Sequence, residues 1–169
     1  TPVTIDQVPL VLQQATVAIE DKNFYKHGGF DLTGIARAFF KTVFTGRVQG
    51  GSTITQQLVK NVLLTQQRTI TRKLKEFILT VQVERHYTKD QILVMYLNEA
   101  PYGGTAWGVQ SASETYFGKS VADLDLAEST VLAGLPQSPT RYSPTAGKLY
   151  VARAAQVLRR MREDGYINH

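Results

Sequence analysis

The sequence predicts an all-α protein. Its apolar residues recur mostly with the 3.6-residue period of an α-helix, and no stretch shows the sustained alternation typical of a β-strand. Six prolines and thirteen glycines divide this pattern into segments of helical length, several of which begin with a capping residue. At 169 residues the chain is long enough to bury a hydrophobic core, so we expect one domain spanning residues 1–169.

The first third of the chain predicts two helices. The first begins near Pro9, because proline favours the first turn of a helix, and it ends near Glu20. The second covers about residues 32–44, is capped by Asp31 and is rich in phenylalanine. Such a segment packs in a core by default, and the alternative is contact with a membrane interface. The loop at residues 45–51 contains three glycines and is a candidate mobile flap.

A longer helix is predicted over residues 70–86. Its apolar residues lie on two sides, which is typical of a buried central helix. Arg72 and Glu76 are four residues apart and share one side with Leu79 and Val83. We interpret the two charged residues as a polar window in a buried element. The alternative is an exposed ion pair, which contributes only a few tenths of a kcal/mol.

Capping signals predict the remaining helices. Thr88 with Gln91 forms a capping-box pattern, and Asp125 with Glu128 forms an acidic variant of it. The predicted helices span about residues 88–98, 106–117, 125–135 and 146–164. The segment between the last two contains three prolines and predicts an extended linker from Pro136 to Pro144. Four arginines of the last helix have a solvated face as their default placement: Arg153, Arg159, Arg160 and Arg162.

The charge balance favours an anionic partner. The net charge is +5 and the pI is near 9.5, which suits nucleic acid, a phosphate ester or an acidic lipid. The basic residues are spread along the chain and form no nucleic-acid-type tail. There is no cysteine, and no run reaches the roughly 18 apolar residues of a transmembrane helix. We expect an excised domain whose anchor or neighbouring domain is missing.

Two stretches carry candidate chemistry. Glu20 is predicted at a helix C-terminus, where the helix dipole raises the pKa of a carboxyl group and suits it to act as a general base. A solvated helix end is the alternative. The stretch from Gly50 to Lys60 predicts a hydroxyl-capped helix start with Gln57 and Lys60 one turn apart. Such a helix start can seat an anion such as phosphate, although an ordinary capped helix fits the same pattern.

These residues favour sugar transfer from a phosphate leaving group. One of the carboxylates Glu20 and Glu76 would deprotonate an attacking hydroxyl, while nearby cations would take up pyrophosphate charge. Paired carboxylates also fit a glycosidase, although a neutral leaving group has little use for the cations. A third alternative is a non-catalytic basic module that docks on anionic membrane or nucleic acid. The histidines lack metal-ligand spacing, and no Walker-type loop or nucleophile elbow is present.

Five motifs, in family order and over almost the whole chain, resemble the peptidoglycan glycosyltransferase (transglycosylase) domain of class A penicillin-binding proteins and monofunctional transglycosylases. The matching stretches are Glu20–Gly28, Gly51–Asn61, Arg72–Glu76, Ile92–Asn98, and Arg153 with Val157 and Leu158. The second stretch is the most specific. In the fifth, Ala154 and Ala155 stand where family members often carry larger polar residues.

The resemblance implies a lysozyme-like fold, in which a larger lobe and a small membrane-facing lobe flank a cleft. It also implies that about residues 36–51 form a mobile membrane-facing segment. The implied reaction is the polymerisation of lipid II into glycan strands with inversion at the donor's anomeric carbon and release of undecaprenyl pyrophosphate. A lytic muramidase-type glycosidase acting on finished peptidoglycan is the alternative enzyme.

By motif position, the resemblance makes Glu20 the general base. It gives Glu76 the task of stabilising the leaving pyrophosphate or positioning the reacting groups, with a divalent cation such as Mg²⁺ or Mn²⁺ as an optional helper. The implied substrate-binding residues are Lys60, Arg72, Lys73, Arg68, Ser52, Thr53, Gln57 and Asn98. The implied supporting residues are Asp21, Phe24, His27 and Tyr96.

The resemblance further implies a place and partners. The enzyme would work at the outer face of a bacterial cytoplasmic membrane, on lipid II and a lipid-linked glycan strand, against an anionic membrane surface and without nucleic acid. Family members usually carry an N-terminal membrane anchor, which this chain lacks. A transpeptidase domain would be a further neighbour.

Overall fold

The computed structural model describes residues 2–26, 53–63 and 69–168, and within these ranges the protein is all-α. In chain order it contains η1 (Ile5–Gln7), α1 (Leu10–Glu20), α3 (Ile54–Val62), α4 (Ile70–His86), α5 (Lys89–Glu99), α6 (Val109–Phe117), η2 (Val121–Asp123), α7 (Leu126–Gly134), α8 (Pro139–Tyr142) and α9 (Leu149–Glu163). Within the described ranges, the β-type pairing is limited to an isolated bridge between Pro101 and Trp107. The predicted fold class is confirmed.

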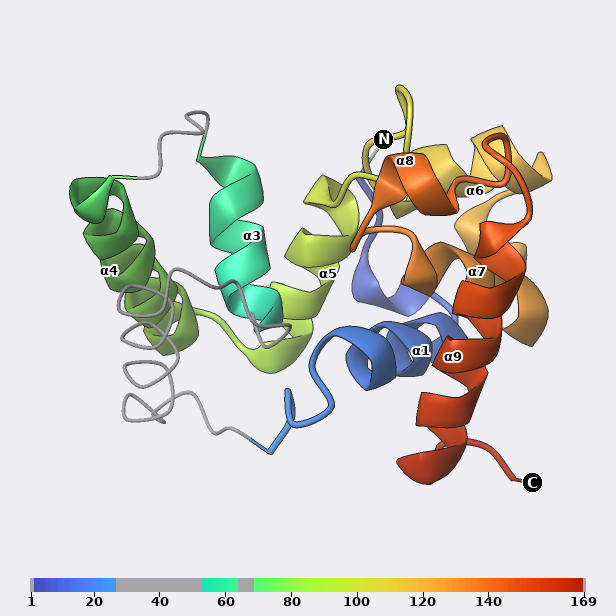
Figure 1. The fold of residues 1–169 in the computed structure, drawn as a ribbon. Helices are drawn as coiled ribbons and strands as arrows, with labels where there is room; N and C mark the ends of the chain where they lie inside the picture. The colour runs from blue at the N-terminus through green and yellow to red at the C-terminus, as the bar shows by residue number, and fades with distance from the viewer. Residues whose placement is uncertain (1, 27–52, 64–68, 169) are drawn as a thin grey trace.

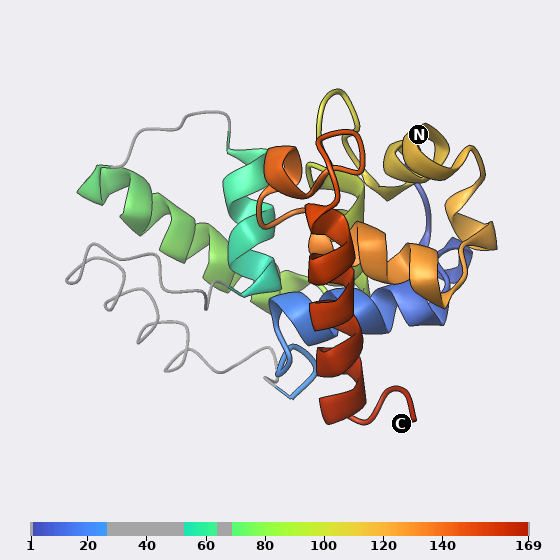
Figure 2. The same cartoon turned by 45° about the vertical axis from the view of Figure 1, so that its right-hand side comes forward.

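The helices form two groups. α1, α7 and α9 pack against one another, and α3 packs against both α4 and α5. In Figures 1 and 2, α4 lies at one edge of the molecule with α3 next to it, while α9 runs across α1 on the other side. A single hydrophobic core joins the groups, and its largest fully buried side chains include Leu12, Phe24, Ile54, Tyr96 and Tyr102.

Local signals place most helix ends where the sequence predicts them. Thr88 accepts from the backbone of Gln91, Asp125 accepts from that of Glu128, and both capping boxes are complete. α4 spans the predicted residues. The helix predicted from residue 106 begins later, at Val109, because Gly108 has a φ of +84°. A Cβ at Gly108 would lie 2.6 Å from the carbonyl oxygen of Asn98, so the close approach to α5 requires glycine.

The placement of α4 corrects one prediction. Ile70, Leu74 and Ile78 are 70%, 47% and 54% exposed, so α4 is not a central helix buried on two sides. The face that packs against α3 is the other one, which carries Leu79 and Val83. Apolar periodicity shows that a face can be buried, but which face finds a partner depends on the tertiary fold.

The segment between α7 and α9 is a second correction. Residues 136–144 are not simply extended, because α8 occupies Pro139–Tyr142. Pro139 stands in the first turn of this short helix, where a missing N–H costs nothing and the fixed φ is helical. The last helix is also shorter than predicted, beginning at Leu149.

A buried ion pair connects four parts of the chain. Glu84 of α4 accepts from Lys89 Nζ at 3.0 Å and 3.2 Å, and the hydroxyl of Thr55 in α3 donates to the same carboxylate. The Glu84 and Lys89 side chains are 6% and 18% exposed. Lys89 Nζ also lies 4.7 Å from the centre of the Phe24 ring, so the pair ties the turn after α1 to α3, α4 and α5.

We predict that Lys89→Met destabilises the fold by about 3 kcal/mol, because it leaves the Glu84 carboxylate buried without its cation. Lys119→Met is the matched control, since Lys119 pairs with Glu128 at the surface and its removal should cost much less. Urea unfolding of both variants measures the difference. Equal midpoints would show that the Glu84–Lys89 pair is no more important than a surface pair.

Candidate active site

Glu20 is the last residue of α1, and its side chain contacts Gln57 of α3. The helix stops there because Asp21, its C-cap, leaves the helical region with φ −162° and ψ 81°. Oε2 of Glu20 accepts a 3.1 Å hydrogen bond from Nε2 of Gln57. Oε1 is buried and has no hydrogen-bond partner among the described residues. Oε2 of this carboxylate therefore accepts a hydrogen bond, and Oε1 accepts none from the described residues.

Burial raises the pKa of Glu20 above its ordinary value, because desolvation penalises the ionised form. The Gln57 hydrogen bond and then the positive charge of Arg153 oppose this shift in pKa, whereas Asp21 adds to it. The sequence predicts the direction correctly. The main cause differs from the predicted helix dipole, since desolvation is the largest contribution.

Gln57 connects Glu20 to the core. It lies on α3, and its Oε1 accepts a 3.3 Å hydrogen bond from the hydroxyl of Tyr96 on α5, whose side chain is fully buried. The amide thus has its donor end on Glu20 and its acceptor end on Tyr96. A glutamine predicted to line the cleft and a tyrosine predicted to support it are joined to the predicted base in one chain of hydrogen bonds.

The N-terminus of α3 lies against the end of α1. Thr53 is the N-cap and forms a complete capping box with Gln56. The backbone N–H of Ile54 donates to Oδ2 of Asp21 at 3.3 Å. The predicted anion seat at this helix start therefore already holds a carboxylate of the chain itself, so Asp21 orders the start of α3.

Glu76 forms a second charged group on α4. Its carboxylate accepts from Arg72 Nε at 3.2 Å and from Lys73 Nζ at 3.4 Å. The three side chains are only 11% to 21% exposed. Arg72 also donates to the carbonyl oxygen of Leu63, the C-cap of α3, at 3.4 Å. The predicted polar window around Arg72 and Glu76 is present, and it faces α3.

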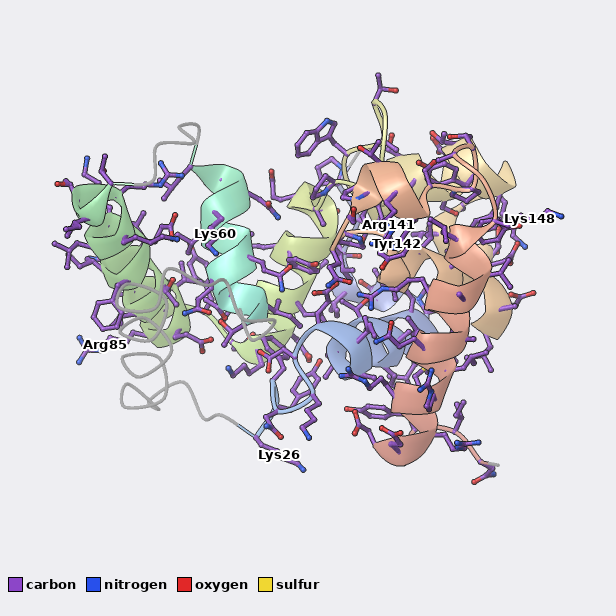
Figure 3. All side chains as sticks on the ribbon, viewed as in Figure 1. Lys26, Lys60, Arg85, Arg141, Tyr142 and Lys148 are labelled. Atoms are coloured by element: carbon purple, nitrogen blue, oxygen red, sulfur yellow. The ribbon has the colours of Figure 1, made fainter. Side chains whose placement is uncertain are left out.

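α3 contacts both Glu20 and the charged residues around Glu76. Gln57 in its first half reaches Glu20, and the backbone at its C-terminal end receives Arg72. Lys60, one turn after Gln57, lies on α3 between these two points of contact (Figure 3). α3, which carries Lys60, thus contacts Glu20 directly and Glu76 through Arg72.

Asn98 holds the N-terminal segment of the chain. Its amide binds both backbone groups of Val3, with Oδ1 accepting from the N–H at 2.9 Å and Nδ2 donating to the carbonyl at 3.0 Å. It also lines an apolar pocket of about 450 Å³ between α3, α4 and α5, beside Leu58 and Val83. Asn98 therefore fastens the N-terminal segment to α5 and makes no described contact with either charged group.

Arg153 is the residue that the sequence analysis placed wrongly. It is 7% exposed, not solvated, and its Nε donates to the carbonyl of Gly134 at 3.1 Å. Its guanidinium carbon lies 5.4 Å from the centre of the Tyr142 ring. Its charge opposes the rise in the pKa of Glu20. A signal existed, because Arg153 has four-residue spacing with the buried Val157 and Met161 and therefore shares their face.

The remaining predicted residues divide into two sets. Phe24 is buried and forms an edge contact with Tyr25, so it supports the turn after α1. His27, Ser52 and Arg68 lie outside the described residues, as do the helix predicted at 32–44 and the segment at 36–51. Sequence reasoning missed Glu84 and Lys89, whose link to Phe24 depends on contacts across distant parts of the chain.

The described residues do not form a metal site. No group of three or more histidine, aspartate, glutamate or cysteine side chains gathers within residues 2–26, 53–63 and 69–168. Glu76, the predicted optional ligand for a divalent cation, is instead flanked by Arg72 and Lys73. These two cationic neighbours disfavour a further cation at Glu76.

The all-α fold, the carboxylate with a raised pKa and the second carboxylate flanked by cations fit a glycosyltransferase. A family model described as Transglycosylase matches residues 1–162, and the chain belongs to this family. The enzyme class is thus peptidoglycan glycosyltransferase, as the motifs predict. Among the part of the chain that the structure describes, no helix is sufficiently long and apolar to cross a membrane.

Almost the whole chain is similar to a segment of proteins that are much longer. It is 43% identical over 169 residues to penicillin-binding protein 1F of Bacillus subtilis, covering 99% of the chain and 24% of that protein. It is 48% identical to penicillin-binding protein 1A of Rickettsia conorii and 46% identical to that of Escherichia coli, each over 98% of the chain. The chain spans 22% and 20% of those two proteins.

We predict that Glu20→Gln stabilises the protein most at neutral and alkaline pH. Because the folded-state pKa of Glu20 is raised, the folded protein holds this proton more tightly, and stability falls as pH rises from the unfolded-state pKa through the folded-state pKa. Glutamine does not titrate, so the variant avoids this loss of stability. The gain in melting temperature should therefore appear at pH values above the folded-state pKa of Glu20 and vanish below its unfolded-state pKa.

Thermal melts of both proteins across about pH 3 to 9, a range that begins below the ordinary carboxyl pKa, measure this effect. Glu163→Gln at the exposed end of α9 is the control and should leave the pH dependence unchanged. A gain that is equal at all pH values would contradict the raised pKa of Glu20.

Proposed function

We propose that this domain polymerises lipid II into peptidoglycan glycan strands and releases undecaprenyl pyrophosphate. The observation that carries the proposal is the state of Glu20, whose Oε1 is buried and unpartnered among the described residues while Oε2 is held by Gln57. A carboxylate with a raised pKa is suited to accept a proton from a hydroxyl group.

In the proposed reaction, Glu20 takes the proton from the 4-hydroxyl of the acceptor, lipid II. The resulting oxygen attacks the anomeric carbon of the donor, which is the growing strand on its lipid pyrophosphate. The bond from that carbon to the pyrophosphate oxygen breaks, and its electron pair leaves with the pyrophosphate. Attack from the opposite face inverts the configuration at the anomeric carbon.

The cations support the departure of the leaving group. Lys60, Arg72 and Lys73 would bind the pyrophosphate with Arg68 as a helper, and Ser52 and Thr53 would line the cleft. Glu76 would hold Arg72 and Lys73 in place, as its two ion pairs do in the structure. Fixed cations in a partly buried site stabilise developing phosphate charge more strongly than cations in water.

We also propose the setting that the motifs imply. The site would work at the outer face of the bacterial cytoplasmic membrane, and the longer protein would add a membrane anchor and a transpeptidase domain. The net charge of +5 suits an anionic membrane surface. The exposed apolar face of α4, with Ile70, Leu74 and Ile78, supports a membrane-facing position for this helix.

We predict that Glu20→Gln lowers the rate of glycan polymerisation by about 10² to 10⁴-fold, the range typical for a general base. Labelled lipid II is incubated with each protein in detergent, and the products are separated by gel. Glu99→Gln, an exposed carboxylate at the end of α5, is the control. A near-normal rate in Glu20→Gln would show that Glu20 is not the base. In a separate incubation with finished peptidoglycan, release of soluble fragments would favour the glycosidase alternative.

We predict that Lys60→Ala weakens binding of a lipid pyrophosphate by about tenfold or more, which corresponds to the loss of one charge-assisted contact. Arg85→Ala is the matched control, because Arg85 is an exposed cation at the far end of α4 (Figure 3). Calorimetric titration with a short-chain prenyl pyrophosphate measures both. An equal loss of affinity in the two variants would show that only the net charge of the protein matters, and it would contradict a pyrophosphate site at Lys60.

A further inference from the structure

The amide of Gln57 can face Glu20 in two ways. Its Nε2 end is a donor and its Oε1 end is an acceptor, and only the donor end stabilises an ionised carboxylate. In the structure Nε2 faces Oε2 of Glu20 at 3.1 Å. A further contact must hold the Gln57 amide in this orientation while the Glu20 carboxylate alternates between its ionised and protonated forms during a catalytic cycle.

Tyr96 is placed to hold it. Its hydroxyl donates to Oε1 of Gln57 at 3.3 Å, and its side chain is completely buried in the core. If the amide rotated, Nε2 would face the Tyr96 hydroxyl and Oε1 would face Glu20. Both hydrogen bonds would then be lost, unless the Tyr96 hydroxyl turned to accept and Glu20 carried a proton to donate. Donation to Oε1 also polarises the amide and strengthens donation from Nε2, as in other hydrogen-bonded chains.

The consequence concerns the hydrogen bond that Glu20 accepts. Oε1 of Glu20 is buried and unpartnered among the described residues, so the Gln57 bond to Oε2 is the side-chain hydrogen bond that stabilises the ionised carboxylate. We propose that Tyr96 is a positioning residue that orients the Gln57 amide and thereby keeps its donor end on Oε2 of Glu20. This inference rests on the proposed role of Glu20 as the base.

Other charged or titratable groups also face Glu20, and they must stay unchanged in a test. Asp21 lies at the end of α1, Arg153 approaches from α9, and Tyr102 lies in the loop after α5. Burial raises the pKa of Tyr96 well above its usual value, so Tyr96 stays neutral. Tyr96→Phe therefore removes a hydrogen bond without changing any charge around Glu20.

The test is a double-mutant cycle with Tyr96→Phe, Gln57→Leu and the double variant, measuring kcat/KM for lipid II polymerisation across pH. Tyr96→Phe should lower kcat/KM by about 5 to 10-fold, which corresponds to one hydrogen bond. It should also move the acidic limb of the profile to higher pH, because a weaker Gln57 contact no longer opposes the rise in the pKa of Glu20.

In the Gln57→Leu background, Tyr96→Phe should have almost no further effect. Fully additive losses would overturn the proposal, because they would show that Tyr96 does not act through Gln57. Tyr25→Phe is the matched control, since its hydroxyl donates to Oδ1 of Asp90 at 3.0 Å, and neither residue acts on the pKa of Glu20. It deletes the same atom and should leave the acidic limb in place.

A second measurement does not depend on any variant folding or on activity. In the unmodified protein labelled with ¹⁵N and ¹³C, the side-chain amide resonances of Gln57 should shift with the same midpoint as the Glu20 carboxyl carbon. Amide resonances that ignore the titration of Glu20 would overturn the proposal. Coupled titration in a protein that fails to polymerise lipid II would instead refute the proposed function and leave the orientation of Gln57 supported.

Discussion

The side chain of Gln57 is where three helices from distant parts of the sequence meet. It donates to Glu20 at the end of α1 and accepts from Tyr96 of α5, while its own helix, α3, packs through Ile54 and Leu58 into the core. A buried polar chain stabilises a fold only when its members keep their partners. α3 therefore cannot rotate or slide without breaking hydrogen bonds at both ends of this amide, and the rotation of α3 fixes where Lys60 lies.

The charge of Glu20 imposes a second constraint on the larger helix group. An ionised carboxylate in a buried position is unfavourable, and Arg153 supplies the opposite charge. That arginine is itself buried, so it needs partners: the Gly134 carbonyl, the Gln156 side chain and the Tyr142 ring. A Cβ at Gly134 would lie 2.6 Å from Cγ of Arg153, so the glycine leaves room for the arginine that balances the base. The packing of α7 against α9 and the ionisation of Glu20 are thus linked.

Local chemistry explains what could be predicted from the sequence, and long-range contacts explain the rest. The ends of α4 and the caps at Thr88 and Asp125 depend on neighbouring residues, and they were predictable. The burial of Arg153 was missed, because a basic helix normally turns its arginines to solvent, although the spacing of Arg153 with Val157 and Met161 places it on the face that packs against α7. For the same reason the pKa of Glu20 was predicted in direction and not in cause, since a helix end shows in the sequence and burial does not.

The state of Glu20 also distinguishes an enzyme from a module that only binds. If Glu20 served only to fasten α1 to α3, a glutamine would do so without a desolvated charge, and its amide could still pair with Gln57. The chain instead holds a carboxylate with one oxygen buried and unpartnered among the described residues, and offsets part of its cost with Arg153. A docking surface for anions gains nothing from a buried negative charge beside its cations. A general base does, because burial raises its pKa and makes it a stronger proton acceptor.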